Sequence, residues 1–303
     1  METADNPLLL CVVGPTACGK THLAVQLARA LDGEIISADS RQVYREMSIG
    51  TGKDLDEYVI DGVSIPYHLI DILDAGSKYS IYEYQRDFKI AYQDIVKRHK
   101  LPILCGGSGL YIESVLNSYR LDYVPINRGF RQKCTTLSME ELSEMLQRKK
   151  KLHNTTDTTD RERLIRALEI ALYNEQYPAK AAKFFPNYKL FHIEVERECL
   201  RQRIAVRLAQ RLENGLVEEV KSLMDKGIDL HYYGLEYRFV SDYLNKTLSY
   251  EEMVERLEIA IGQFAKRQQT WFNRMKRNGF ELIDIDEKLS DDEKLQFVIQ
   301  CCR

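Results

Sequence analysis

Short apolar runs alternate with helical patterns over the first third of the 303-residue chain. The runs have the length of strands and lie at residues 8–13, 34–38, 65–70 and 101–105. Apolar positions with helical spacing lie between them, at residues 21–31 and 82–98. Because strands that alternate with helices form crossover units, the pattern predicts an α/β fold with a parallel sheet flanked by helices.

The pattern changes near Leu121, where the chain becomes polar, charged and rich in helical spacing. Ser138 and Glu141 match a capping box, and the turn at 154–160 is placed to cap a helix that begins near Arg161. We therefore expect a helical insertion at 121–185 and a core made of 1–120 and 186–303.

Strand and helix signals return after the insertion. A strand is expected at 190–195, followed by helices at 198–214, 216–226 and 250–276. The last apolar alternation, at 280–285, is consistent with an edge strand.

Composition indicates the cellular compartment of the protein and the kinds of site that it lacks. The seven cysteines form no Cys-x-x-Cys pair, which argues against a disulfide framework and against a zinc site. No positively charged stretch followed by an apolar segment precedes the first predicted strand, and no apolar run reaches the roughly 18 residues of a membrane span. We expect a cytoplasmic monomer that does not bind membranes. A net charge of −3 means that any nucleic-acid surface is local.

The strongest chemical signal is a glycine-bracketed loop between the first strand and the first helix. Its residues fit G-x-x-x-x-G-K-[ST] and are Gly14, Pro15, Thr16, Ala17, Cys18, Gly19, Lys20 and Thr21. In a P-loop NTPase-like fold, the loop amides and the helix N-terminus hold an anion, the lysine adds charge, and the threonine hydroxyl ligates Mg²⁺. A nucleotide or any other diphosphate ester would suit this cradle, and the alternative is a turn without a ligand.

Two further residues follow predicted strands, at the sheet edge where parallel sheets bind ligands. Asp39 has a carboxylate suited to holding Mg²⁺ through water or to accepting a proton, and the less favoured alternative is that it only caps the next turn. Ser108 lies in a Gly-rich turn, which lets backbone approach a ligand or simply makes a tight bend.

Arginines recur every four residues in the helix expected at 198–214. Arg203, Arg207 and Arg211 therefore line one helix face. Taken alone, this spacing favours a solvated basic face over a phosphate site.

The motifs together resemble the tRNA dimethylallyltransferase family, which transfers a five-carbon prenyl group to N6 of an adenine next to the anticodon. The resemblance extends from Leu8 to about Phe272 and depends on these stretches in this order: "GPTACGKT", "SADSRQVYREMSIGTGK", "HLIDILD", "YSIYEYQRDF", "PILCGGSGLY", "DRERLIRALEI" and "KRQQTWF".

The resemblance implies a role for each matching residue. The loop would hold the diphosphate of dimethylallyl diphosphate with Mg²⁺ on Thr21, and Asp39 would be the general base. The implied catalytic residues are Asp39, Ser108, Lys20 and Arg207; many members have Thr at the Ser108 position. The implied tRNA contacts are Asp39, Ser40, Arg41, Gln42, Glu162, Arg163 and Arg166. The family often has a Gly-Tyr-Arg-Gln run where this chain reads Gly-Leu-Glu-Tyr-Arg-Phe from Gly234, and from this departing stretch only Tyr237 and Arg238 are carried over.

Basic stretches indicate where an RNA anticodon stem-loop would bind. They are residues 127–133, 147–151 and 266–277, together with Arg161, Arg163 and Arg166. Trp271 lies at helical spacing with apolar neighbours, so we assign it to the core rather than to a stacking surface.

Three other functions use parts of the same pattern. An isopentenyltransferase acting on free adenine nucleotides needs the same loop and base but no RNA-binding insertion. A P-loop small-molecule kinase would be favoured by "GPTACGKT" alone. A non-catalytic RNA-binding module has no need of Lys20, Thr21 and Asp39 together.

Overall fold

The computed structural model describes residues 7–117, 119, 121, 123–149, 160–177 and 186–302. The chain divides into two compact units. Met1–Tyr119 and Phe184–Arg303 form unit 1, and Arg120–Lys183 form unit 2. Each unit is described by itself.

Unit 1 contains a six-stranded sheet in the order β5-β2-β6-β1-β7-β8. Every pairing in it is parallel, so the predicted α/β parallel sheet is confirmed. The strands are β1 (Leu8–Val13), β2 (Gly33–Ser37), β5 (Tyr67–His68), β6 (Leu101–Gly106), β7 (Asn187–Glu194) and β8 (Leu282–Asp286).

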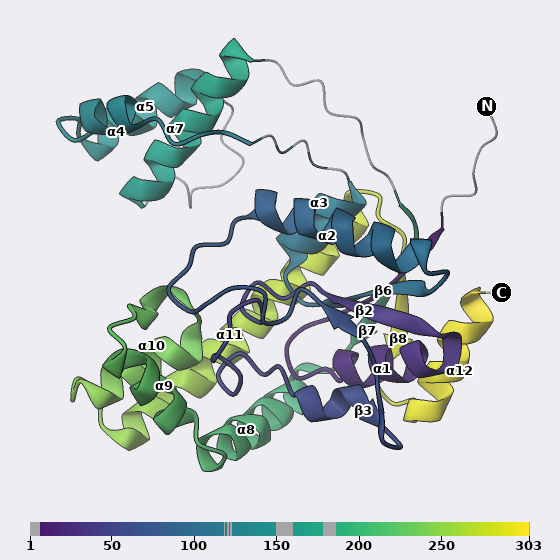
Figure 1. Ribbon diagram of the computed structural model, residues 1–303. Helices are drawn as coiled ribbons and strands as arrows, with labels where there is room; N and C mark the ends of the chain where they lie inside the picture. Colours follow the sequence, from purple (N-terminus) through teal and green to yellow (C-terminus); the bar gives the residue numbers. More distant parts are fainter. Residues whose placement is uncertain are drawn as a thin grey trace, which may run out of the picture. The chain divides into compact units, whose positions relative to one another are not determined.

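Side chains alternate between the two faces of β1, as the two-residue period of a strand requires. Leu9 and Val13 pack on one face against α2 (Ile81–Lys97) and α3 (Gly109–Leu116), while Leu10 packs on the other against α1 (Lys20–Leu31) and α12 (Asp291–Cys302). Figure 1 shows helices covering both faces of the sheet. A parallel strand buried on both sides explains the continuous apolar run at the start of the sequence.

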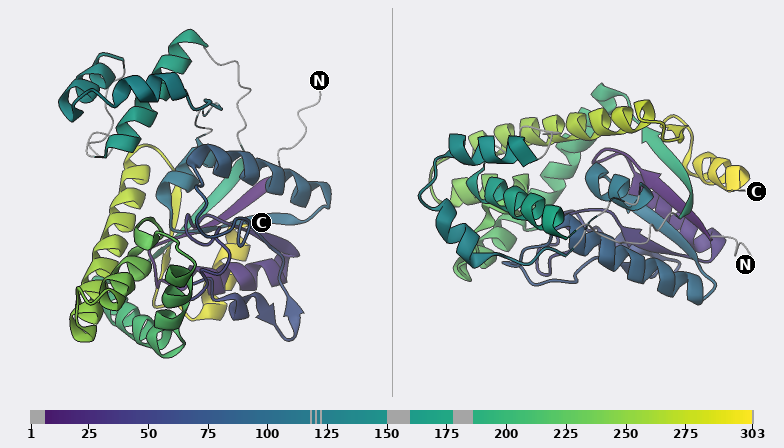
Figure 2. Two further views of the ribbon diagram at one scale, coloured as in Figure 1. Left: turned by 60° about the vertical axis from the view of Figure 1, so that its left-hand side comes forward. Right: turned by 90° about the horizontal axis from the view of Figure 1, so that it is seen from above.

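A group of helices forms a second core in unit 1 (Figure 2). It consists of α8 (Arg197–Glu213), α9 (Leu216–Asp225), η2 (Leu230–Tyr232), α10 (Leu235–Leu244) and α11 (Tyr250–Arg277). The 28-residue α11 connects the two cores, since Leu257 belongs to the helical core and Phe272 to the sheet core. Among the helices that the structure describes, none is both long and apolar enough to cross a membrane.

A small hairpin follows the loop after β2. The 3₁₀ turn η1 (Leu55–Tyr58) leads into β3 (Val59–Ile60), which pairs antiparallel with β4 (Val63–Ser64). Tyr58 is buried against the α1 side of the sheet and anchors this segment.

The described residues of unit 2 include the helices α4 (Arg128–Cys134), α5 (Met139–Lys149) and α7 (Arg161–Gln176). Its core is formed by Cys134, Leu142, Leu146, Leu164 and Leu168. The predicted capping box is present, because Glu141 accepts from the Ser138 N–H at 2.7 Å and donates its own N–H to the Ser138 hydroxyl at 3.2 Å. Asp160 caps α7 as expected, while the rest of the predicted turn, 154–159, lies outside the described residues.

The strand predicted at 65–70 is much shorter than its apolar run. Only Tyr67–His68 pairs in the sheet. Leu69 and Asp71 have φ angles of 63° and 55°, and this left-handed backbone takes the chain out of the sheet. Ile65 and Ile70 are still buried, so the apolar run marks burial rather than strand pairing.

Candidate active site

A cavity of about 1150 Å³ lies beyond the carboxyl ends of the central strands in unit 1. Its walls come from the glycine loop after β1, the loops after β2 and β6, and helices α8 and α11. Parallel sheets bind ligands at this edge.

The loop between β1 and α1 has the backbone of a phosphate cradle. Gly19 and Ala17 adopt φ angles of 87° and 61°, which turn the chain sharply into α1. The Lys20 ammonium donates to the Pro15 carbonyl at 3.1 Å. Thr16, Ala17, Gly19, Lys20 and Thr21 line the cavity, whereas Cys18 is buried behind the loop.

Asp39 faces the same cavity directly after β2. Its Oδ1 accepts a hydrogen bond from the Arg41 N–H at 2.8 Å, so it does cap the following turn. Its other oxygen, Oδ2, has no hydrogen-bond partner in the part of the chain that the structure describes. One carboxylate therefore supports the turn and still offers an oxygen to a ligand.

Ser108 lies in the loop after β6 and joins it to the turn after β2. Its hydroxyl accepts from the Ser40 N–H at 3.1 Å, and its own N–H donates to the Ala38 carbonyl at 3.1 Å. A Cβ on Gly106 would overlap the Ala38 carbonyl, so the close approach of the two loops requires glycine there.

The predicted RNA contacts at 39–42 differ in their environments. Ser40, Arg41 and Gln42 all line the cavity, and Arg41 is exposed. The Gln42 amide is engaged within the fold, since its Oε1 accepts from the Ser37 hydroxyl at 2.9 Å and its Nε2 donates to the Gly52 carbonyl at 3.0 Å. Gln42 thus joins the loop to the end of β2.

Arg207 and Arg211 of α8 bind groups of the protein, so a solvated face does not describe these two side chains. Arg207 donates to the Thr16 hydroxyl at 3.4 Å, which places its guanidinium beside the glycine loop. Arg211 is only 12% exposed and pairs with Glu236 at 3.0 Å. Burial lowers the pKa of Arg211 and raises the pKa of the Glu236 carboxyl.

A carboxylate that sequence reasoning missed organises the loop after β2. Glu219 on α9 accepts hydrogen bonds from the N–H groups of Ser48, Ile49 and Gly50 at 2.8–2.9 Å, and from the Tyr237 hydroxyl at 2.7 Å. Tyr237 is fully buried, so its side chain supports the loop from behind. The apolar spacing around Glu219 predicted only a helix.

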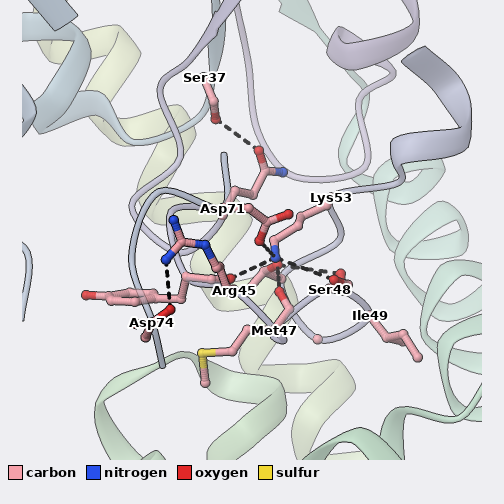
Figure 3. Close-up of polar contacts among 12 residues, drawn as sticks. Ser37, Arg45, Met47, Ser48, Ile49, Lys53, Asp71 and Asp74 are labelled. Atoms are coloured by element: carbon pink, nitrogen blue, oxygen red, sulfur yellow. Dashed lines mark hydrogen bonds and ion pairs between the residues drawn. The ribbon is translucent and has the colours of Figure 1, made fainter. Parts of the chain in front are cut away.

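Lys53 fixes the same loop from inside (Figure 3). The side chain is 1% exposed, and its ammonium forms an ion pair with Asp71 and donates to the Tyr44 carbonyl at 2.7 Å. Lys53 lies in "SIGTGK" and Asp71 in "HLIDILD", two of the stretches that carried the family resemblance. That resemblance was the signal in the sequence that could have pointed to this pair.

Helix α11 packs directly against two of the loops. The buried Gln268 amide accepts from the Thr16 N–H at 2.8 Å and donates to the Gly107 carbonyl at 3.0 Å. A Cβ on Gly109 would overlap the Trp271 ring, which is partly buried against the sheet core and also lines the cavity. The prediction that Trp271 belongs to the core is therefore confirmed for the part of the ring that packs against the sheet core, while the residue also borders the cavity.

The remaining predicted RNA contacts lie on α7 in unit 2. Arg166 bonds to Glu169 at 3.0 Å and to the Val124 carbonyl at 2.6 Å, so its guanidinium stabilises unit 2. Glu162 and Arg163 are exposed, and the Arg163 side chain has no partner among the residues described in this unit.

The donor set suits a cation held mainly by phosphate. In the described parts of the chain, no group of three or more His, Cys, Asp or Glu is arranged to hold a metal ion. Thr21 lines the cavity beside Lys20, and Mg²⁺ commonly uses one or two protein oxygens together with substrate phosphates and water. Thr21 fits that requirement.

Comparison with known proteins places the chain in a family. The model of the IPP transferase family matches residues 42–275, and an isopentenyl transferase model matches residues 8–74. The chain belongs to the IPP transferase family. Its IPP transferase relatives include tRNA dimethylallyltransferase 2 of Bacteroides fragilis, which is 50% identical over 96% of this chain and 97% of the relative. The Phocaeicola vulgatus protein of the same name is also 50% identical, over 99% and 98%.

Solved structures agree with this family assignment. The tRNA isopentenylpyrophosphate transferase of Bacillus halodurans shares 31% identity and a TM-score of 0.71, covering 98% of this chain and 95% of the other. A eukaryotic dimethylallyltransferase acting on tRNA has a TM-score of 0.77 at 23% identity, over 93% and 74% of the chains, which shows a common fold.

Proposed function

We propose that this IPP transferase transfers the dimethylallyl group from dimethylallyl diphosphate to N6 of the tRNA adenosine next to the anticodon, position 37. The observation that carries the proposal is the shared cavity. It brings Lys20 and Arg207 at the glycine loop together with Asp39, whose second oxygen has no partner in the described structure. An anion cradle beside a proton acceptor is what this alkylation requires.

The cradle stabilises the leaving group. As the bond between the allylic carbon and oxygen breaks, negative charge concentrates on the departing diphosphate. Loop amides, the Lys20 ammonium and the Arg207 guanidinium would bind that charge, and one such donor in a desolvated site contributes about 3–4 kcal/mol to the transition state. Mg²⁺ held by Thr21 would add further neutralisation of the diphosphate.

Asp39 handles the proton. Adenine N6 is a weak nucleophile because its lone pair is delocalised into the ring. As the new bond between N6 and the allylic carbon forms, Asp39 Oδ2 would take one N6 proton, while Oδ1 keeps the turn in place through the Arg41 N–H. The Ser108 hydroxyl accepts a hydrogen bond from Ser40 in this turn and would contact the diphosphate near its bridging oxygen.

RNA binding requires an extruded base and a basic surface. A stacked adenine does not present N6 to a buried electrophile, so the target base would enter the cavity from an open loop. We assign the anticodon stem-loop contact to unit 2, where Arg163 is exposed, together with Ser40 and Arg41 at the cavity.

Mass analysis of tRNA nucleosides tests the proposal. The protein is incubated with unmodified tRNA and dimethylallyl diphosphate, and the digest is examined for a five-carbon addition on adenosine. Parallel reactions contain AMP in place of tRNA, or ATP with a panel of small acceptors. Addition to AMP alone would favour the free-nucleotide enzyme, and ATP-dependent phosphorylation would favour the kinase. Either outcome replaces the proposal.

A further inference from the structure

Arg207 already has an anionic partner in the cavity. Its Nη2 forms an ion pair with the Asp54 carboxylate and donates to the Gly52 carbonyl at 3.5 Å, while Nη1 reaches the Thr16 hydroxyl. The Arg207 and Asp54 side chains are 29% and 36% exposed. The guanidinium assigned to the diphosphate is therefore already paired with a carboxylate of the protein itself.

The backbone holds Asp54 in this position. Asp54 has a φ of 46°, in the left-handed region, and directly precedes η1, whose Tyr58 is buried. Gly52, two residues earlier, has a φ of 59°, and a Cβ there would overlap the guanidinium groups of Arg207 and Arg211. The contact is thus built by a fixed segment of chain packed against α8.

Two anions compete for one guanidinium. A diphosphate oxygen and the Asp54 carboxylate need the same N–H donors, and holding both close together adds like-charge repulsion. Binding a diphosphate must therefore replace one ion pair by another, which lowers the net affinity. The same exchange runs in reverse when the product leaves.

We propose that Asp54 is a resident counter-ion of Arg207 that an incoming diphosphate displaces, and that it limits diphosphate affinity so that the product is released. This inference rests on the proposed function, because it assumes that Arg207 contacts the diphosphate. It assigns to Asp54 a role in setting affinity and product release.

Binding of inorganic pyrophosphate to the full chain tests the exchange, with calorimetry as the measurement and EDTA present. Asp54→Asn keeps the size of the side chain and removes its charge, and we expect the Kd to fall about three- to tenfold. Asp56→Asn is the matched control, since Asp56 lines the same cavity and has no side-chain partner among the described residues. The control should change the Kd by less than about twofold.

Repeating the measurement in a variant without Arg207 tests whether the effect of Asp54 depends on the ion pair. In Arg207→Gln, Asp54→Asn should strengthen pyrophosphate binding by less than in the wild-type background, because the contested donor is gone and only the relief of like-charge repulsion is left. Asp54→Ala repeats the charge removal if the Asn variant does not fold. An unchanged or higher Kd in the Asp54 variants, or an equal gain in Asp56→Asn, would overturn the inference. Weaker binding only when Mg²⁺ is added would assign Asp54 to the metal instead.

The result separates this inference from the function it rests on. If wild-type protein binds pyrophosphate and Asp54→Asn binds it equally well, only the role of Asp54 is lost. If wild-type protein fails to bind pyrophosphate with or without Mg²⁺, the cradle itself is refuted and the proposed function falls with it.

Discussion

Gln268 bonds to Thr16 across 252 residues of sequence, its side-chain oxygen accepting the Thr16 N–H at 2.8 Å. The nitrogen of the same amide donates to the Gly107 carbonyl at 3.0 Å. One buried side chain on α11 therefore sets the spacing between the phosphate cradle and the loop that carries Ser108. The geometry of the cavity depends on this helix as much as on the sheet edge.

Replacing Gln268 should lower activity through misplacement of the two loops. Gln268→Met removes both hydrogen bonds at similar volume, and we expect kcat/KM for prenyl transfer to fall about 10- to 100-fold. Gln269→Met, the next residue on α11, is the matched control and should stay near wild type. Steady-state kinetics with saturating tRNA provide the measurement, and equal activity of the two variants would remove Gln268 from this role.

A Glu substitution distinguishes positioning from general stability. In Gln268→Glu, a protonated carboxyl both accepts from the Thr16 N–H and donates to the Gly107 carbonyl, whereas a carboxylate loses the donor. The activity of this variant relative to wild type should therefore rise as pH falls from about 8 to 6, because burial favours the neutral acid. A ratio that does not depend on pH would argue against the bridge.

Asp39→Asn separates the two proposed roles of the Asp39 side chain, which are to accept the N6 proton and to hold the following turn. The amide oxygen still accepts the Arg41 N–H and keeps the turn, but it takes no proton at neutral pH. Turnover should fall about 10²- to 10⁴-fold while pyrophosphate binding stays near wild type. Single-turnover prenyl transfer and pyrophosphate calorimetry measure the two effects. Retained turnover would show that another group accepts the N6 proton.

The sequence was sufficient for local features and insufficient for distant pairings. The strand β1, the glycine loop and the cap at Ser138 follow from adjacent residues, and the structure places each where its pattern predicted. Lys53 and its partner Asp71 are 18 positions apart in the sequence, and Gln268 is 161 positions from Gly107 and 252 from Thr16. Hydrophobic periodicity carries no signal for such distant contacts.

Arg207 shows a similar limit. Taken alone, its four-residue spacing favoured a solvated face, and only the folded chain brings it to Thr16. The family resemblance pointed to Arg207 because it carries information that one sequence does not contain.

Disrupting Glu219 should destabilise unit 1 more than removing one of its partners. Glu219→Ala leaves the three N–H groups and the Tyr237 hydroxyl without their acceptor, at an expected cost of about 2–4 kcal/mol in the free energy of unfolding. Tyr237→Phe removes one donor and should cost about 1 kcal/mol. Urea unfolding followed by circular dichroism measures both, and an equal cost would contradict the shared-acceptor arrangement.

Stability should decrease in acid partly through Glu34. Hydrogen bonds from Arg98 lower the pKa of this carboxyl despite its burial, and His68 contributes a further bond at 2.7 Å. Because the folded pKa lies below the unfolded value, the contribution is complete above the ordinary Glu range and is lost as pH falls through the folded pKa. Glu34→Gln should therefore reduce the slope of unfolding free energy against pH between about 5 and 3. An unchanged slope would exclude Glu34 as a source of acid sensitivity.

Two arginines on α7 should separate RNA contact from structural support. Arg163 is exposed without a partner among the described residues of unit 2, so Arg163→Gln should weaken tRNA binding and reduce the slope of log K against log salt concentration by about 1, with little effect on folding. Arg166→Gln removes bonds to Glu169 and Val124 and should destabilise unit 2 instead. Filter binding across a salt series, with pyrophosphate affinity as a reference, checks the first expectation. If Arg163→Gln leaves the salt slope unchanged, the RNA contact does not include this side chain, because a lost phosphate contact releases one counterion fewer.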